Sequence, residues 1–325
     1  MHPLSNTPFF LGVNYPWRNY GQDFGRAGAE HCGISLTPAQ EQVGRDFKHI
    51  AETGAMVVRW FLFGDGRGGF ASEGEIPRKP DQFLFADVAA ALQLAQRYNL
   101  KLCFSLIDYH WLQEHPQNQN AHPNRRVLHF AAGREAFLQN VLIPLFREFR
   151  GHPALFAWEI ANEPEWTIRE FQSRSPGKLH YADFRAYAGE IARAVHEYAG
   201  VPATLASARL LWVRAWTELG LDYYQAHYYP AAEEETKRDL AQQLMNLPPL
   251  DKPLWMGELP ARDPAHPRYS LHQSLELCRS AGLCGAAVWR WTEPESQGTD
   301  VAIGRVDPAE LKAWSASERS EGQRA

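Results

Sequence analysis

The feature that most constrains the fold is a regular alternation of short apolar runs with longer amphipathic stretches. The apolar runs have the length of strands, and most are apolar at nearly every position, as are strands buried on both faces of a parallel sheet. The eight runs cover residues 9–15, 55–63, 100–109, 155–160, 203–207, 223–229, 253–259 and 284–291. This alternation predicts an α/β protein built on a parallel sheet.

The stretches between these runs have the apolar period of helices. Examples are residues 37–54, 85–99, 134–151, 181–200 and 269–282. Several of them end in a glycine directly before the next strand, a common helix stop signal. Pro144 falls inside the third stretch and should kink or split that helix. Eight strands with interleaved helices predict a (β/α)8 (TIM) barrel, with a doubly wound open sheet as the structural alternative.

The length of 325 residues fits one barrel, and no linker or shift in composition divides the chain. We expect a single barrel domain over residues 1–314 and a disordered tail over residues 315–325. The segments 64–82, 110–128 and 164–180 are long, and polar or rich in glycine and proline. Each of them follows a strand, and in a barrel such loops form the C-terminal face, where active sites lie.

Composition excludes several classes of partner. A net charge of −5, from 33 basic and 38 acidic side chains, gives no basic surface for nucleic acid and no polybasic segment for a membrane. No window reaches the ~18 apolar residues of a membrane helix, and the first residues do not have the pattern of a signal peptide. We therefore expect a cytoplasmic protein, or an extracellular one if a leader has been trimmed.

The cysteines give no framework of disulfides. Cys32, Cys103, Cys278 and Cys284 lack the CxxC spacing, and Cys103 lies inside an apolar run. We expect buried free thiols, with a Cys278–Cys284 disulfide as the alternative.

Two glutamates stand at the ends of apolar strands, where a charge is costly unless it is used or paired. Residues 155–166 read LFAWEIANEPEW, so this strand leads directly to Asn162 and Glu163, and Pro164 fixes the exit of the chain. The run PLWMGEL ends close to Glu258. Two carboxylates facing each other across a barrel suit retaining glycoside hydrolysis, in which one protonates the leaving oxygen and the other attacks the anomeric carbon. That chemistry predicts carboxyl groups about 5–5.5 Å apart.

Further polar and aromatic side chains fall at the same strand ends. They are Arg59, His110, His227, Tyr229, Trp289 and Trp291. An arginine keeps a neighbouring carboxylate ionised, a tyrosine hydroxyl orients it, and a tryptophan face packs against a sugar ring. The set predicts a pyranose site in which Arg59 and Tyr229 approach Glu258. Ion pairing or packing without substrate contact is the alternative for each. Trp17, Trp111 and Trp166 fit sugar platforms and ordinary loop packing equally, and Glu165 fits a loop residue or a support for its neighbours.

Several motifs together resemble the glycoside hydrolase clan A barrels, and most closely the family-five cellulases and mannanases. The motifs are WEIANEPE, KPLWMGE, HYYP, SLIDYHWL and the join LIPLFREFRGHPALFAWEI, and the resemblance runs from Phe9 to Trp291. The segments GVNYPWRNYGQDFG and GDGRGGF depart from the family pattern.

The resemblance implies a role for each matching position. Glu163 corresponds to the acid/base, Glu258 to the nucleophile and Asn162 to the residue that binds the sugar 2-hydroxyl. The matches to the −1 subsite are Arg59, His110, His227, Tyr229 and Trp289, and we place Trp291 with them. Both β-glucan and β-mannan substrates, as oligo- or polysaccharides, fit this resemblance.

Other functional classes have less support in the sequence. Residues 64–69, GDGRGG, have a G-x-G-x-x-G spacing after a strand, but no helix pattern follows to hold a phosphate, so we interpret them as a flexible rim loop. The sequence has no HExxH motif and no HxH pair on the first strand, and we expect neither a metal nor another cofactor. A catalytically silent glycan-binding barrel is the remaining alternative, although it would not need both glutamates.

Overall fold

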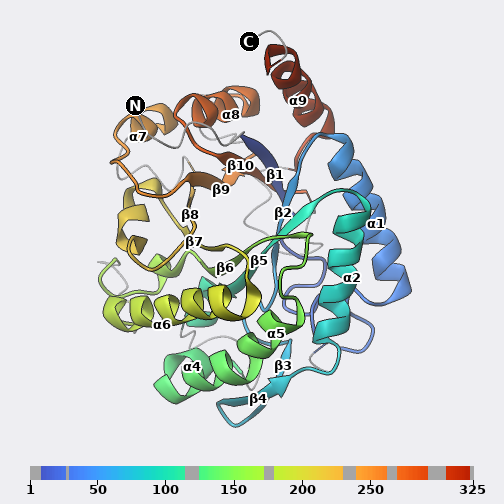
Figure 1. Cartoon of the computed structure of the whole chain (residues 1–325), viewed down its shortest axis with the longest axis vertical. Helices are drawn as coiled ribbons and strands as arrows, with labels where there is room; N and C mark the ends of the chain where they lie inside the picture. Colours follow the sequence, from blue (N-terminus) through green and yellow to red (C-terminus); the bar gives the residue numbers. More distant parts are fainter. Residues whose placement is uncertain are drawn as a thin grey trace.

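The structure is a computed structural model that describes residues 9–26, 29–113, 124–171, 179–229, 239–261, 269–291 and 305–322. Its centre is a closed barrel of eight parallel strands, in the order β1-β10-β9-β8-β7-β6-β5-β2, with helices around the outside (Figure 1). The strands are β1 (Phe10–Asn14), β2 (Val57–Phe61), β5 (Lys101–Asp108), β6 (Leu155–Asn162), β7 (Ala203–Ser207), β8 (Tyr223–His227), β9 (Leu254–Pro260) and β10 (Gly285–Trp289). All eight predicted runs form barrel strands, so the predicted TIM barrel is confirmed and the open sheet is excluded.

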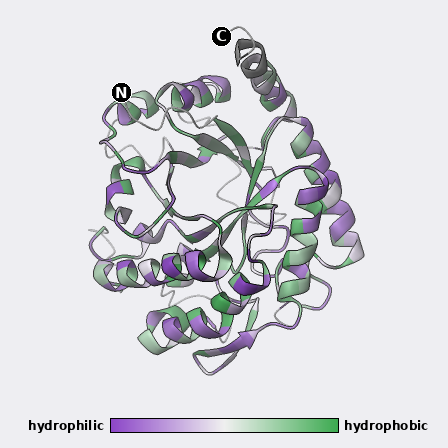
Figure 2. Cartoon of the chain, viewed as in Figure 1, coloured by the Kyte–Doolittle hydropathy of each residue, from purple (hydrophilic) through white to green (hydrophobic). Residues whose placement is uncertain are grey.

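The helices turn an apolar face to the barrel and a polar face outward (Figure 2). In α1 the buried side chains Val43, Phe47 and Ile50 are spaced four and three residues apart, which places them on one face. The α-helices are α1 (Thr37–Glu52), α2 (Leu84–Arg97), α3 (Tyr109–Leu112), α4 (Ala131–Phe137), α5 (Ile143–Glu148), α6 (Tyr181–Ala194), α7 (Leu240–Met245), α8 (Leu271–Ser280) and α9 (Pro308–Gly322). The shorter helical elements are η1 (Val127–His129), η2 (Leu138–Leu142), η3 (Pro164–Trp166), η4 (Val195–Ala199) and η5 (Leu210–Trp216).

The helix predicted over residues 134–151 is divided, as expected from Pro144. A π-helical turn, η2, separates α4 from α5, and Pro144 occupies the first turn of α5. Proline has no backbone N–H to donate and its ring collides with a carbonyl one turn earlier, so the helix widens just before it.

The segment after β2 differs from the flexible rim loop that the sequence suggested. It carries a hairpin, β3 (Phe70–Glu73) and β4 (Ile76–Pro80), and the glycine-rich turn before the hairpin is packed. Asp65 is buried and ion-pairs with Arg67 at 2.6 Å. Gly66 has φ +80° and lies directly against the indole of Trp111. The glycines therefore serve close packing between loops.

Trp111 belongs to the hydrophobic core. Its side chain is 1% exposed, its ring packs against Phe70 and Phe137, and its indole N–H donates to the carbonyl oxygen of Asn124 at 3.0 Å. Of the two interpretations the sequence allowed for Trp111, packing is the one the structure supports.

The end of the chain also differs from the sequence prediction. The tail expected over residues 315–325 is helical as far as Gly322, because α9 continues through it, and residues 323–325 lie outside the described part. Trp314 fixes this helix: its indole N–H donates to Glu276 at 2.9 Å and its ring packs on Phe9. The four cysteines are buried and free, so the expected free thiols are confirmed and the Cys278–Cys284 bond is not formed.

The barrel interior is layered, and this layering positions the site. Phe10, Cys103, Trp255 and Ala287 form an apolar cluster near the N-terminal ends of the strands, joined by the partly buried Tyr223. Along each strand, alternate residues face the same side, so the next inward positions lie above this floor. Those positions carry the polar side chains described below.

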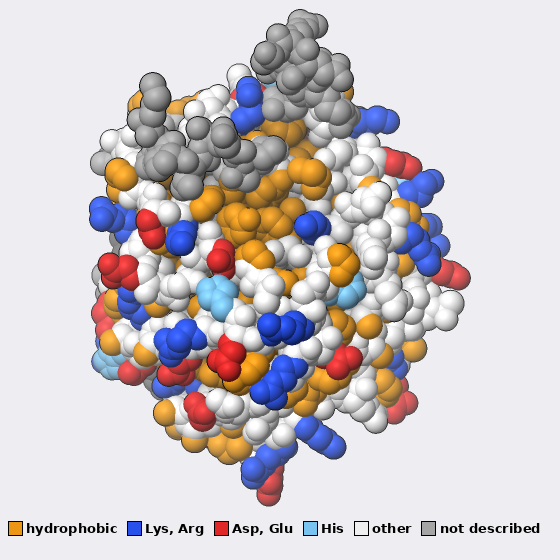
Figure 3. Space-filling view, viewed as in Figure 1, with side chains coloured by type: hydrophobic (Ala, Val, Ile, Leu, Met, Phe, Trp, Pro, Cys, Tyr) orange, Lys and Arg blue, Asp and Glu red, His pale blue; other side chains and the backbone are white. Residues whose placement is uncertain are grey.

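The surface bears charges of both signs. On the face shown in Figure 3, acidic and basic side chains are interspersed rather than gathered into a basic patch. Among the described residues, no helix is long and apolar enough to cross a membrane.

The packing of Gly66 generates a stability prediction. A Cβ at Gly66 would stand 2.1 Å from an atom of the buried Trp111 ring, whereas a Cβ at Gly74, which also has a positive φ (+60°), meets nothing within 4 Å. We expect Gly66→Ala to lower the free energy of unfolding by about 1–3 kcal/mol more than Gly74→Ala, through overpacking. Urea unfolding of both variants measures this difference. Equal decreases in the free energy of unfolding would show that the turn at Gly66 can shift to accommodate a Cβ.

Candidate active site

The predicted site residues gather at or near the C-terminal ends of several barrel strands. Arg59 lies on β2, Asn162 ends β6, and Glu163 is the next residue. His227 ends β8 and is paired in register with Glu258 on β9. Arg59 and Glu258, 199 positions apart in the chain, lie on strands that are not paired, so it is the closure of the barrel that brings them into contact.

Arg59 is the centre of a buried hydrogen-bond network. Its side chain is 0% exposed, and its Nε and Nη2 donate to the two oxygens of Glu159, both at 2.6 Å. Its Nη1 donates to Glu258 at 2.6 Å and to Asn14 at 3.0 Å, while Nη2 also donates to Asn162 at 2.7 Å. Burial disfavours the charged guanidinium, but Glu159 and Glu258 outweigh it and raise the pKa of Arg59, so the side chain stays protonated.

Glu258 is held on both carboxylate oxygens. Arg59 donates to Oε1 at 2.6 Å, and the hydroxyl of Tyr229 donates to Oε2 at 2.7 Å. Burial raises the pKa of Glu258, and the neighbouring Glu163 raises it further. His227, Arg59 and the Tyr229 hydrogen bond act in the opposite direction. Arg59 and Tyr229 thus approach Glu258 as the sequence led us to expect, and both favour its ionised form.

Glu163 occupies a different environment. Its backbone is left-handed, with φ 49° and ψ 46°, between the end of β6 and the short turn η3. Its Oε1 lies 2.7 Å from Nδ1 of His227, and its Oε2 accepts from the indole N–H of Trp166 at 2.8 Å. Burial is the main cause that raises the pKa of Glu163 to about 7, with the Trp166 hydrogen bond opposing it.

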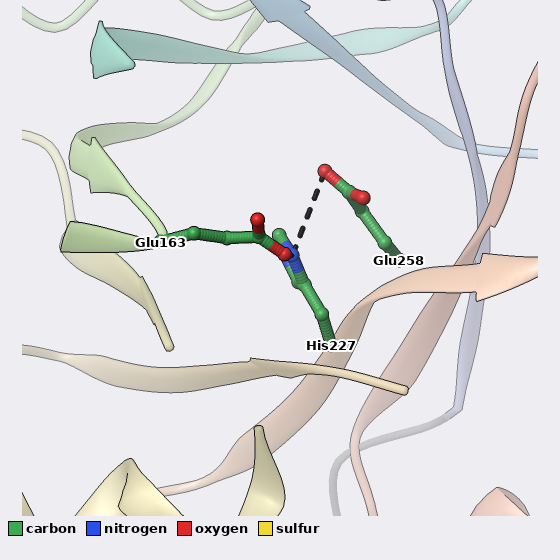
Figure 4. Close-up of side chains that lie close together, drawn as sticks. All are labelled: Glu163, His227 and Glu258. Carbon is green, nitrogen blue, oxygen red and sulfur yellow. Dashed lines mark hydrogen bonds and ion pairs between the residues drawn. The ribbon is translucent and has the colours of Figure 1, made fainter. Parts of the chain in front are cut away.

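The imidazole of His227 lies between the two carboxyl groups (Figure 4). One ligand atom each from Glu163, His227 and Glu258 fall within 4.8 Å of one another, a spacing that would also suit a metal ion. However, all four carboxylate oxygens already take part in the hydrogen bonds named above. We therefore interpret the cluster as two carboxyl groups bridged by an imidazole.

The protonation of His227 follows from its surroundings. The ring is fully buried, and burial is the main cause that lowers its pKa to about 4, so the ring is neutral at neutral pH. Nδ1 faces Glu163 at 2.7 Å and Glu258 at 3.6 Å, and both of these are carboxylate oxygens. We assign the proton to Nδ1, where it can be donated to Oε1 of Glu163, because a bare ring nitrogen there would face the Glu258 oxygen that accepts from Arg59.

Asp108 organises the third side of the site. It accepts from the side-chain amide of Asn162 at 3.0 Å and from the hydroxyl of Tyr20 at 3.1 Å, and it lies 2.8 Å from Nδ1 of His110. Burial opposes the charged form of His110, but the hydrogen bond and charge of Asp108 outweigh it and raise the pKa of His110. Since Asn162 donates to Asp108, its amide oxygen is left to accept from Arg59. This fixes the orientation of the amide.

The two tryptophans of the last strand lie differently. Trp289 ends β10, and its ring meets the edges of Trp17 and Phe61. Trp291 lies beyond the strand and is 3% exposed within the hydrophobic core. Strand alternation therefore ends at Trp289 and does not extend to Trp291.

Several residues of the network were not predicted as site residues. They are Asn14, Tyr20, Asp108, Glu159 and Gln225, the last of which donates to Glu159 at 2.9 Å. One signal was available: Glu159 is a charge inside an apolar strand, which requires a partner. Glu165, expected in a loop or as a support, is fully buried and accepts from Ser207 and Trp216, both at 2.6 Å.

Comparison with known proteins supports the fold and the resemblance. No protein-family profile matches the chain. The mannan endo-1,4-beta-mannosidase of Cryptopygus antarcticus is 27% identical over 164 residues, which are 50% of this chain and 39% of that protein. The enzyme of the same name from Mytilus edulis is 26% identical over 169 residues, or 51% of this chain and 42% of that protein. The matched part thus spans about two-fifths of the length of these relatives.

Solved structures cover more of the chain. The beta-mannanase from Mytilus edulis superposes with a TM-score of 0.71 at 18% identity, covering 95% of this chain and 92% of that one. The mannanase from Cryptopygus antarcticus gives 0.71 at 19% identity, with 95% and 90% covered. A GH5_18 protein from Streptomyces cattleya, solved with Manb1-4GlcNAc, gives 0.65 at 16% identity, with 96% and 80% covered. The chain thus has the TIM-barrel fold of these proteins, and the mannanase names of its relatives support the resemblance to family-five cellulase- and mannanase-like barrels.

The Arg59–Glu159 pair generates a second stability prediction. Both side chains are 0% exposed, so Glu159→Gln removes one partner of a buried pair and should lower the free energy of unfolding by about 3–5 kcal/mol. Glu73→Gln is the matched control. Glu73 ion-pairs with Arg78 at a similar distance, 2.7 Å, but the side chains of Glu73 and Arg78 are 79% and 55% exposed. The control should lose no more than about 1 kcal/mol. Chemical denaturation compares the two, and a mild effect at Glu159 would mean that Arg59 is held by its other partners.

Proposed function

We propose that this protein is a retaining glycoside hydrolase that cleaves β-1,4 bonds in mannan-type oligo- and polysaccharides. The observation that carries the proposal is the pair of strand-end glutamates, whose ligand oxygens lie within 4.8 Å of each other across one imidazole. A retaining mechanism needs carboxyl groups about 5–5.5 Å apart, whereas an inverting enzyme leaves about 6.5–9.5 Å for a water. The substrate class follows from the names of the relatives, which are mannanases.

The two environments assign the two roles. Glu258, whose carboxylate oxygens accept from Arg59 and Tyr229, is the nucleophile. Glu163, with a pKa raised to about 7 by burial, is protonated in about half of the molecules at neutral pH and is the acid. Glu163 protonates the leaving oxygen while Glu258 attacks the anomeric carbon, and the glycosyl group becomes bonded to Glu258. Glu163, now ionised, then removes a proton from water, which attacks the same carbon and releases Glu258.

The remaining residues support the sugar in the reacting position. Asn162, fixed by Asp108 and Arg59, is proposed to bind the 2-hydroxyl. His110 and Trp289 complete the −1 subsite, together with Arg59, His227 and Tyr229. We keep Trp291 as a proposed substrate-binding residue, although its burial in the hydrophobic core does not favour this role. The barrel over residues 1–314 would act as one catalytic domain, without a cofactor.

The roles of the two glutamates can be separated by product stereochemistry. An aryl β-mannoside with a very acidic phenol needs no acid, so Glu163→Ala should still form the glycosyl intermediate, and added azide should give the β-azide. On mannan this variant should lose about 10²–10⁴-fold in kcat/KM, the usual contribution of general acid catalysis. Glu258→Ala lacks the nucleophile, and azide should there give the α-azide.

The measurement is NMR of the azide products, with wild-type protein as the control. The opposite stereochemistry would exchange the two roles. Wild-type turnover in both variants would overturn the assignment of both glutamates. No turnover of β-mannan, β-glucan, xylan or aryl β-glycosides by the wild type would instead support a silent glycan-binding barrel.

The pKa of Glu163 predicts the alkaline side of the pH profile. Above a pH of about 7 Glu163 loses its proton, so kcat/KM for a mannooligosaccharide should fall about tenfold per pH unit. At its ordinary pKa of 4.5 Glu163 would already be ionised at neutral pH. Because burial raises this pKa to about 7, Glu163 can donate a proton up to about pH 7 and loses this ability above it. With the activated aryl mannoside the alkaline fall should be absent, because that leaving group needs no acid. A fall of equal steepness with both substrates would point to a different group.

A further inference from the structure

Trp166 follows Glu163 by three residues and turns back toward it. The short turn η3 brings the indole N–H of Trp166 to 2.8 Å from Oε2 of Glu163, while His227 holds Oε1 at 2.7 Å. The carboxyl group is therefore held at both oxygens by N–H groups from two different strand ends. A carboxyl group held at both oxygens cannot rotate about its terminal bond without breaking one of these contacts.

The indole itself is supported from two sides. The guanidinium of Arg209, a buried residue, lies 5.3 Å from the Trp166 ring centre. The ring of Trp212 meets the Trp166 ring at 5.5 Å in an edge-on arrangement. Such aromatic and cation contacts restrict the ring to one position.

The turn beneath the indole is anchored by Glu165. This side chain is 0% exposed and accepts from the Ser207 hydroxyl at 2.6 Å, the Trp216 indole at 2.6 Å and the Ala208 backbone N–H at 3.1 Å. These partners come from the end of β7 and from η5. The turn that joins Glu163 to Trp166 is therefore attached to the neighbouring strand of the barrel, and its direction is fixed.

We propose that Trp166 is a positioning residue for Glu163. The indole N–H of Trp166 fixes the carboxyl group of Glu163 in the orientation needed for proton transfer to and from the glycosidic oxygen. This inference rests on the proposed role of Glu163 as acid/base and deepens it. The hydrogen bond also stabilises the ionised carboxylate, so it opposes the effect of burial on the acid. The indole thus affects both the orientation of the Glu163 carboxyl group and its pKa.

The test compares Trp166→Phe with Trp212→Phe. Both variants replace an indole by a phenyl ring in the same aromatic cluster, but within the described residues Trp212 makes no hydrogen bond to Glu163. In the free protein, a carbon-13 NMR titration of the Glu163 carboxyl group should give a midpoint about one pH unit higher in Trp166→Phe, the size expected for a hydrogen bond to a charged group. Trp212→Phe keeps the Trp166 indole N–H and leaves a ring packed against it, so it should shift the midpoint much less.

Kinetics provide the second readout. Trp166→Phe should lower kcat/KM for a mannooligosaccharide by about tenfold or more, because a misplaced acid contributes less. For the activated aryl mannoside its kcat/KM should stay within about twofold of wild type, since no acid is needed there. An equal loss on both substrates, or an unchanged titration midpoint, would overturn the proposal by reducing Trp166 to a structural role.

The two proposals fail in different ways. If the wild type cleaves no β-glycoside, the proposed function fails, while the titration still shows whether Trp166 controls Glu163. Should Trp166→Phe fail to fold, the wild-type protein decides: the Trp166 indole N–H resonance should shift with pH around a midpoint near 7, and Glu163→Gln should abolish this shift. A pH-independent resonance would overturn the proposal.

Discussion

The site depends on the burial of one guanidinium group. Arg59 has no exposed surface, and its five N–H groups face Glu159, Glu258, Asn14 and Asn162, which lie on β1, β6 and β9. A buried charge is costly unless it is fully paired, so each partner is held where the pairing is complete. The planar fork of arginine defines the directions of these bonds, which a lysine in the same place would not do. The strand ends are thereby fixed relative to one another at the level where a sugar would react.

The same network explains why two glutamates a few ångströms apart differ in their chemistry. Glu258 shares Arg59 with Glu159 and receives the Tyr229 hydroxyl, so donors of high strength favour its charge. The hydrogen-bonding partners of Glu163, Trp166 and His227, are neutral, and its side chain is largely buried, so its charged form is disfavoured. The His227 ring between them is neutral at neutral pH, because burial lowers its pKa to about 4. Burial raises the pKa of both carboxyl groups, but the cationic donor Arg59 opposes this directly at Glu258, whereas the hydrogen-bond donors of Glu163 are neutral.

Much of this arrangement can be predicted from the sequence, because the length and spacing of the apolar runs determine where each strand begins and ends. Each apolar run became a barrel strand, and the polar residue after such a run, as at Glu163, fell at the mouth of the barrel. Contacts between strands are different, since they depend on register and on bulges such as the one between Ala226 and His227. The pairing of Asp108 with Asn162 and of Glu159 with Arg59 could therefore not be predicted from local pattern. The packed turn at Gly66 was also missed, because glycine permits both flexibility and close packing.

The left-handed backbone of Glu163 has a consequence for the balance between stability and activity. A residue with a side chain pays about 1–2 kcal/mol for this conformation, and a carboxyl group at this position is also removed from water. Glycine or asparagine would adopt the same backbone more easily and would carry no ionisable group into the barrel mouth. Against this backbone cost stand the two hydrogen bonds of the carboxyl group, to Trp166 and to Nδ1 of His227, whose donors would lose their acceptor in either replacement. Glu163 therefore holds a conformation that other residues adopt more easily, and its neighbours are built around its carboxyl group.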